Sequence, residues 1–243
     1  MGRFDSLPAR ERIMVALDCT PDEARELAGR LGGHATWLKV GITLIYAGGL
    51  PLVRELSERG FKVFVDAKFH DIPHQVRGAV LAAATSGADL ITVHGSGGAA
   101  MLEACHEGAG LARERLGHAP LLAAITVLTS MDADALASVG VSRPIPEQAA
   151  ALATLAQRSG IDGVVCSPKE AREMRGLLGP DALVVCPGVR PAGSALGDQS
   201  RVATPAQAIA AGASHIVVGR PITQAPDAAA SFDAIEREVA SAL

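Results

Sequence analysis

The feature that most constrains the fold of this chain is a regular alternation of short apolar segments with longer amphipathic ones. The short segments are rich in Val, Ile and Leu and are bounded by Gly, Pro or charged residues, which is typical of buried β-strands. Parallel strands need a long crossover between them, so this alternation predicts a parallel sheet. The predicted strands are 12–18, 36–40, 61–69, 89–94, 120–128, 163–166, 183–186 and 215–218.

Eight strand–helix units in 243 residues fit a closed (β/α)8 barrel, or TIM barrel, which typically needs about 250 residues. We expect an N-terminal extension over 1–11 and a single α/β barrel domain over 12–243. An open, doubly wound sheet is the alternative. Its dinucleotide loop has one candidate at 95–100 (GSGGAA), but this segment follows the fourth strand, and the fifth strand ends without an acidic residue. A tight turn is therefore the preferred interpretation.

Three segments predict helix starts with a capping box, in which a Ser or Thr side chain and the side chain three residues later bond each other's backbone N–H. Each also carries proline at the first helical position. The boxes begin at Thr20, Ser167 and Thr204.

Composition excludes several classes of protein. Apolar residues make up 49% of the chain and charged residues 20%, as in soluble globular proteins. The net charge of −4 and the absence of a basic arm argue against a nucleic-acid partner. The longest apolar run, 119–128, is about half of the ~20 residues that a membrane span needs, and the first residues lack the apolar core of a signal peptide. We expect a cytoplasmic protein with no membrane partner.

Metal and disulfide sites are not expected either. The cysteines are scattered without a C-x-x-C pair, and His70 and His74 are separated by a proline that argues against a helical metal pair. The four cysteines, which we interpret as packing residues, are Cys19, Cys105, Cys166 and Cys186.

The most informative stretch is 61–73 (FKVFVDAKFHDIP). With a period of two, Asp66 and Lys68 share one face of the strand, and Asp71 follows it. Asp18 and Lys39 stand at the ends of the first two strands, so the charges alternate around the barrel end where active sites lie. At an effective dielectric constant of about 20, a pair near 4 Å interacts by roughly 4 kcal/mol. A catalytic array and a structural salt-bridge network both remain open interpretations.

The last strands predict a phosphate site. The loop at 187–199 (PGVRPAGSALGDQ) is long and polar, and strand 215–218 leads into Gly219-Arg220. Loops after the seventh and eighth strands of such barrels often bind phosphate, for which Gly219 offers backbone N–H groups and Arg220 a bidentate fork. A mere surface loop is the weaker alternative.

Together these motifs resemble the orotidine 5′-phosphate decarboxylase family over nearly the whole chain. The resemblance rests on ALD at 16–18, LKVG at 38–41, DAKFHDIP at 66–73, VLTSM at 127–131, PGVRP at 187–191, GDQ at 197–199 and VVGRPIT at 217–223. It implies a cofactor-free and metal-free homodimeric lyase that converts orotidine 5′-monophosphate to UMP in the last step of pyrimidine biosynthesis.

The resemblance also implies residue roles. Lys39, Asp66, Lys68 and Asp71 form the charged tetrad, and Lys68 protonates C6 of the substrate. Asp71 and Ile72 reach into the site of the neighbouring subunit. The remaining substrate-binding positions are Asp18, Thr129, Arg190, Gln199, Gly219, Arg220 and, where the family often has threonine, Gln75.

Two other functions compete with this prediction. A related barrel phosphate-sugar decarboxylase or aldolase would share the D-x-K-x-x-D core but use magnesium. A non-catalytic barrel could instead bind a phosphate ligand while its ionic array only stabilises the fold.

Overall fold

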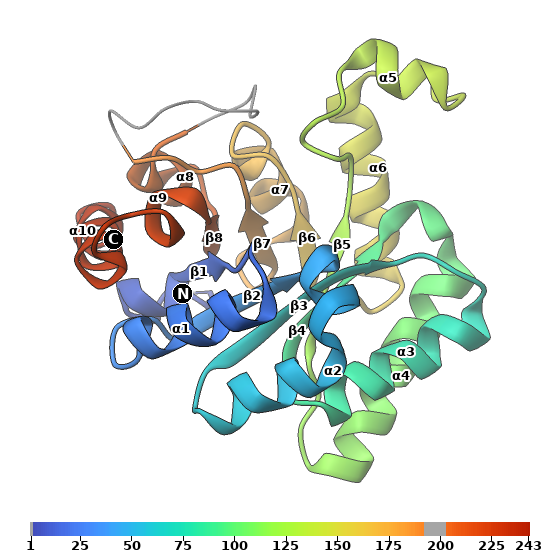
Figure 1. Cartoon of the computed structure of the whole chain (residues 1–243). Coiled ribbons are helices and arrows are strands. Elements are labelled where there is room, and N and C mark those ends of the chain that lie inside the picture. The colour runs from blue at the N-terminus through green and yellow to red at the C-terminus, as the bar shows by residue number, and fades with distance from the viewer. Residues whose placement is uncertain (1, 192–202) are drawn as a thin grey trace.

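The computed structural model, which describes residues 2–191 and 203–243, shows eight parallel strands closed into one barrel (Figure 1). Strand β1 pairs with both β2 and β8, which completes the ring. The predicted TIM barrel is therefore confirmed. The strands are β1 (Ile13–Ala16), β2 (Trp37–Gly41), β3 (Lys62–Phe69), β4 (Ala88–His94), β5 (Leu121–Ile125), β6 (Gly163–Val165), β7 (Leu183–Cys186) and β8 (His215–Val218).

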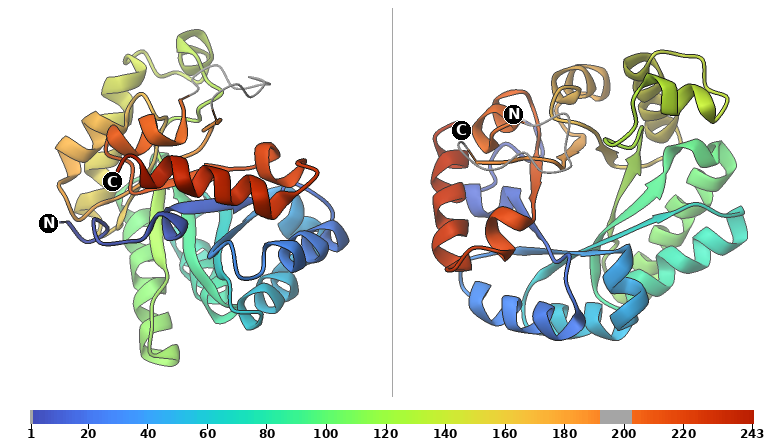
Figure 2. Two further views of the ribbon diagram at one scale, coloured as in Figure 1. Left: turned by 90° about the vertical axis from the view of Figure 1, so that its left-hand side faces the viewer. Right: turned by 45° about the horizontal axis from the view of Figure 1, so that its top comes forward.

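Helices surround this barrel as an outer ring, and α5 stands away from the ring at one end (Figure 2). The α-helices in the described residues are α1 (Pro21–Leu31), α2 (Ile42–Glu58), α3 (Pro73–Thr85), α4 (Ala99–Leu116), α5 (Ala133–Ser138), α6 (Ile145–Arg158), α7 (Ala171–Leu178), α8 (Pro205–Ala210), α9 (Arg220–Thr223) and α10 (Ala228–Ala240). Two short 3-10 helices, η1 (Ala9–Arg12) and η2 (Gly95–Gly97), complete the elements. Within the described residues, no helix has the length and apolar character needed to cross a membrane.

The core has two layers because successive strand residues point to opposite faces of the sheet. Val63 and Val65 belong to the layer between strands and helices, whereas Phe64 belongs to the inner cluster that fills the barrel. The period-two assignment of β3 is thus correct. Asp66 continues the inward face beyond Phe64, toward the carboxyl ends of the strands.

The N-terminal end of the barrel is covered by residues 2–12. Phe4 joins the inner cluster, and its ring meets the His215 ring edge-on with centroids 5.4 Å apart. The Arg12 side chain donates hydrogen bonds to the carbonyls of Phe4 and Asp5 at 2.7 and 2.9 Å. The backbone N–H of Arg3 donates to Asp181 at 2.8 Å. These contacts fix the segment against the barrel base.

The sequence pattern predicts a helix over 50–59, but α2 begins eight positions earlier, at Ile42. Its first part runs from Ile42, and the helix is kinked at Gly49, where φ is 65° and ψ is −171°. Glycine tolerates this left-handed backbone conformation. Pro51 lies in the first turn after the kink, where a proline is tolerated. The Gly-Gly-Leu-Pro sequence marks a kink here rather than a helix start.

Two of the three predicted capping boxes are present. Thr20 and Thr204 each exchange both hydrogen bonds with the residue three positions later. The box at Ser167 is wrong, because α7 begins at Ala171. The N–H of Glu170, which the Ser167 hydroxyl would need, donates instead to the Ser167 carbonyl at 3.0 Å in a turn. The Glu170 carboxylate still accepts from the Ser167 N–H at 3.0 Å.

Candidate active site

Four charged side chains form a continuous array at the carboxyl ends of β1, β2 and β3. The carboxylate of Asp66 lies between two ammonium groups, with Oδ2 at 3.2 Å from Lys39 Nζ and Oδ1 at 2.9 Å from Lys68 Nζ. Lys39 Nζ also lies 3.7 Å from Asp18 Oδ1. The order along the array is therefore Asp18, Lys39, Asp66, Lys68, with alternating sign as the sequence predicts.

Asp66 is the buried centre of this array, with only 9% of its surface exposed. Burial by itself raises the pKa of the Asp66 carboxyl, but the charges of Lys39 and Lys68 and hydrogen bonds from Lys68 and Thr92 outweigh it and lower that pKa below its ordinary value. The carboxylate is consequently ionised at neutral pH. Each ammonium group is thereby held at a fixed point of the barrel mouth.

The array faces a cavity of about 410 Å³, within the size range of small-molecule sites. Its walls are apolar where the barrel interior ends, at Phe64, Val165 and Val217. The cavity brings together eight of the predicted site residues, which are Asp18, Lys39, Asp66, Lys68, Thr129, Arg190, Gly219 and Arg220.

The two arginines reach the cavity from different elements. Arg190 follows β7 and is buried, with 9% of its surface exposed. Arg220 begins α9 directly after Gly219 and β8. Pro187 and Gly188 line the same side. The cavity thus has carboxylates and ammonium groups on the β1–β3 side and guanidinium groups on the β7–β8 side.

Three predicted residues lie away from this cavity in the isolated chain. Asp71 and Ile72 belong to a separate depression beside His70 and Met101, and the Asp71 carboxylate accepts the N–H of Ile72 at 2.6 Å. Gln75 is exposed on α3. Of the four residues predicted to form a charged tetrad, Lys39, Asp66 and Lys68 therefore lie together at the cavity and Asp71 does not. Gln199 lies outside the described residues.

Sequence reasoning missed two residues at this site. Gln224, at the end of α9, lines the cavity. Thr92 on β4 is fully buried and donates a hydrogen bond to Asp66 Oδ1 at 3.0 Å. The period-two pattern of β4 could have identified Thr92, because Thr92 shares the face of the polar residue His94 at the end of that strand.

No group of three or more His, Cys, Asp or Glu side chains in the described part of the chain has an arrangement suited to a metal ion. In the cavity, the positive charge comes from Lys39, Lys68 and the two arginines. Such cations bind oxyanions and stabilise negative charge that develops during a reaction.

This combination defines the class of protein: a TIM-barrel enzyme with an ionic site at the carboxyl ends of its strands. Residues 11–235 match the model of the orotidine 5′-phosphate decarboxylase / HUMPS family. The chain belongs to this family, which places it among the carboxy-lyases, as the sequence resemblance predicts.

Similar proteins agree with this assignment over nearly their full length. An orotidine 5′-phosphate decarboxylase of Halorhodospira halophila is 50% identical over 98% of this chain and 99% of its own. One of Moorella thermoacetica is 48% identical over 95% and 93%. The crystal structure of the Lactobacillus acidophilus enzyme superposes with a TM-score of 0.85 at 38% identity, covering 94% of this chain and 99% of that one.

Proposed function

We propose that the protein converts orotidine 5′-monophosphate to UMP, the last step of pyrimidine biosynthesis, in the cytoplasm and without a cofactor. The observation that carries the proposal is the Asp66 carboxylate held between Lys39 and Lys68 in the cavity that Arg190 and Arg220 also line. A monophosphate nucleotide with a carboxylate on its base has two anionic ends. The cavity offers cations for both.

Lys68 is the proposed proton donor. Cleavage of the bond between C6 and the carboxylate releases CO2 and leaves the electron pair on C6, where no π system delocalises it. A nearby ammonium group stabilises this developing charge, and the Nζ–H proton of Lys68 then moves to C6. Water restores the proton to Lys68. Asp66, at 2.9 Å, holds the ammonium group in place.

The phosphate of the substrate is assigned to the other side of the cavity. Arg190 and Arg220 supply guanidinium groups, and Gly219 lies at the start of α9 without a side chain. Gln199 joins this set in the proposal. Because the phosphate is remote from the bond that breaks, its binding energy acts by positioning the base against Lys68.

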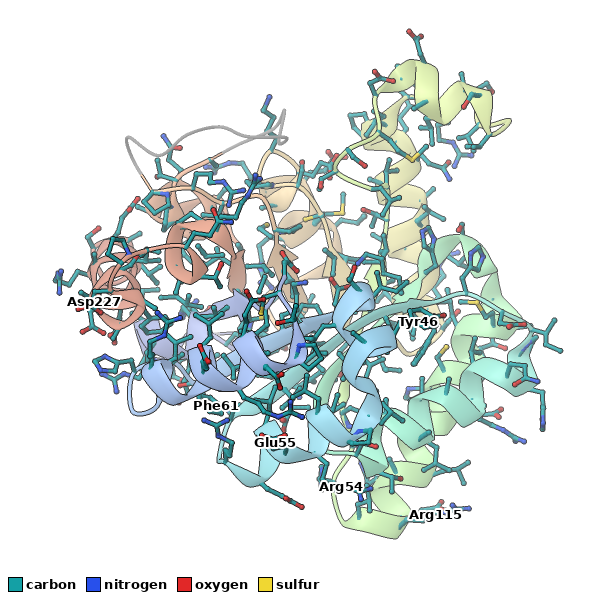
Figure 3. All side chains as sticks on the ribbon, in the orientation of Figure 1. Tyr46, Arg54, Glu55, Phe61, Arg115 and Asp227 are labelled. Carbon is teal, nitrogen blue, oxygen red and sulfur yellow. The ribbon has the colours of Figure 1, made fainter. Side chains whose placement is uncertain are left out.

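A homodimer completes the site in this proposal. A second hollow of about 490 Å³ lies between the β1–α1 loop and the start of α2, and it reaches Lys39, Asp66 and Lys68. Three large apolar side chains are exposed on the α2 and β3–α3 segments: Ile42 at 50%, Tyr46 at 86% and Ile72 at 63%. Tyr46, on α2, is labelled in Figure 3. Ile42 and Tyr46 are four residues apart and are therefore neighbours on one face of α2, and exposed apolar side chains that form a patch mark an interaction surface. We assign Asp71, Ile72 and Gln75 of each chain to the hollow of its partner.

The direct test follows the ultraviolet absorbance of orotidine 5′-monophosphate mixed with the purified protein. We expect turnover that EDTA does not abolish, because the proposed chemistry uses no metal. Loss of activity with EDTA and its return with magnesium would favour the phosphate-sugar decarboxylase or aldolase alternative. Absence of turnover, with retained phosphate-ligand binding, would favour the non-catalytic one.

Two sets of variants test the residue roles. Arg220→Ala should lower kcat/KM by about 100-fold or more, since it removes a charge-assisted contact to phosphate. Normal kinetics in this variant would refute the phosphate assignment.

The shared site is tested by complementation between two inactive variants, Lys68→Ala and Asp71→Asn. When both dimers are dissociated and mixed, half of the sites in each hybrid combine an intact Lys68 with an intact Asp71 from the partner. We expect activity to return in proportion to the hybrid fraction. Hybrids that form but stay inactive would contradict the assignment of Asp71 across the interface.

A further inference from the structure

Thr92 stands at the point where the regular pairing of β3 and β4 is interrupted. Val65 pairs with Ile91 and Phe69 pairs with Val93, so four positions along β3 correspond to two along β4. The extra residues form a bulge in β3 that contains Asp66 and Lys68. Thr92 lies opposite this bulge and is completely buried.

The backbone of Lys68 is unusual. Its φ is 52°, and it is the only non-glycine residue with positive φ in the described part of the chain. A residue with a Cβ atom rarely adopts this conformation, and it persists where the surroundings enforce it. Positive φ at Lys68 accompanies the return of its side chain toward Asp66, two residues earlier, at 2.9 Å.

A bulge removes ladder partners from the backbone groups inside it. The N–H of Lys68 donates to the hydroxyl oxygen of Thr92 at 2.9 Å instead of to a strand carbonyl. The same hydroxyl donates its own hydrogen to Asp66 Oδ1 at 3.0 Å. One buried side chain therefore contacts the backbone of the proton donor and the carboxylate that holds its ammonium group.

We propose that Thr92 is a positioning residue that fixes the β3 bulge and so holds Lys68 and Asp66 in register with the substrate. It does not touch the reacting atoms and acts through these two residues. Its effect on turnover rests on the proposed function. The hydrogen bond by which the Thr92 hydroxyl holds the Lys68 amide is independent of that function.

The inference is tested with Thr92→Val, which keeps the branched shape and removes the hydroxyl, and with Thr92→Ser, which keeps the hydroxyl. Thr126→Val is the matched control, because the buried Thr126 hydroxyl donates to the Val165 carbonyl at 3.2 Å and does not contact the array. Thr92→Ala serves if Thr92→Val does not fold. Each protein is measured by amide hydrogen exchange at Lys68 and by kcat and KM for orotidine 5′-monophosphate.

We expect the Lys68 amide of Thr92→Val to exchange about tenfold faster than in the wild type, because a hydrogen bond is lost. We expect kcat to fall by about 10- to 100-fold with KM changed by less than about threefold, because misplacement of the donor by a fraction of an ångström affects the chemical step. Thr92→Ser should restore both quantities, and Thr126→Val should leave both near wild type.

Unchanged exchange at Lys68 in Thr92→Val overturns the proposal, and so does a loss of kcat that Thr126→Val reproduces. If the wild type does not turn over the nucleotide, the proposed function fails. The exchange measurement still decides in that case whether Thr92 holds the Lys68 backbone.

Discussion

One residue, His215, is expected to contribute strongly to the loss of folding stability at acid pH. This side chain begins β8 and is fully buried at the barrel base, between the rings of Phe4 and Trp37 at centroid distances of 5.4 and 6.0 Å. Its Nδ1 lies 3.0 Å from the Ser214 hydroxyl. Burial, and then the charges of Arg12, Lys62 and Arg175, lower the pKa of His215 to about 3.

Linkage between protonation and folding determines how the free energy of unfolding changes with pH. An unfolded chain protonates this histidine below its ordinary pKa of about 6.5, whereas the folded protein does not until about pH 3. The contribution of His215 to the free energy of unfolding is therefore fully present above about pH 6.5 and falls by roughly 1.4 kcal/mol per pH unit below that pH. Between about pH 7.5 and about pH 4.5 the loss from this residue is about 3 kcal/mol.

The assay compares urea unfolding of the wild type and His215→Phe, followed by circular dichroism across this pH range. Other groups titrate as well, so the informative quantity is the difference between the two proteins. We expect the free energy of unfolding of the wild type to drop about 3 kcal/mol further than that of the variant. His215→Gln serves if the phenylalanine is not accommodated, and His118→Gln, at an exposed position, controls for substitution of a histidine.

Parallel curves for wild type and His215→Phe would refute the reasoning, since they would show that the buried imidazole does not resist protonation. A wild type that gains stability relative to the variant on acidification would reverse the sign and point to a protonated, paired histidine in the folded protein.

Three further predictions concern the site, the base and the proposed interface. Gly41→Ala places a Cβ atom 3.2 Å from Lys39 Nζ, so kcat/KM for orotidine 5′-monophosphate should fall about tenfold. Gly78→Ala is the control, because its added Cβ meets no atom within 4 Å, and it should leave kcat/KM unchanged. If the two variants have the same kcat/KM, the role of Gly41 is contradicted. Phe4→Ala should lower the free energy of unfolding by about 3 kcal/mol in urea while kcat stays the same, and an altered kcat would show that the base and the site are coupled. Tyr46→Arg should shift the protein toward monomer in sedimentation velocity, and an unchanged profile would argue against this surface as the interface.

Periodicity was sufficient to predict the barrel and the inward face of β3. Alternation places Phe64, Asp66 and Lys68 on one side, and closure of the ring then brings Asp18 and Lys39 to the same mouth. Strand order and charge were enough here, because neighbouring strands in a barrel are neighbours in sequence.

Features that depend on competition between hydrogen bonds could not be predicted. Ser167 has the sequence of a capping box, but its carbonyl forms a turn with the Glu170 N–H and delays the helix. The bulge at Lys68 contains no glycine that would indicate it in the sequence, and it depends on Thr92, 24 residues later. The start of α2 was missed because Gly49 and Pro51 interrupt the apolar pattern within one helix.

The cover over the barrel base has a consequence for how the chain is made. Arg3 meets Asp162 and Asp181, which lie 159 and 178 residues further along, and β1 pairs with β8. A chain growing from its N-terminus therefore leaves Phe4 without its His215 contact and one edge of β1 without a partner strand until β8 has been synthesised. Unpaired edges and exposed aromatic side chains favour aggregation. Ribosome-bound chains that stop before His215 should accordingly need chaperones. When β8 leaves the ribosome, it should pair with β1 and contact Phe4, so the barrel closes and its base is covered in the same step.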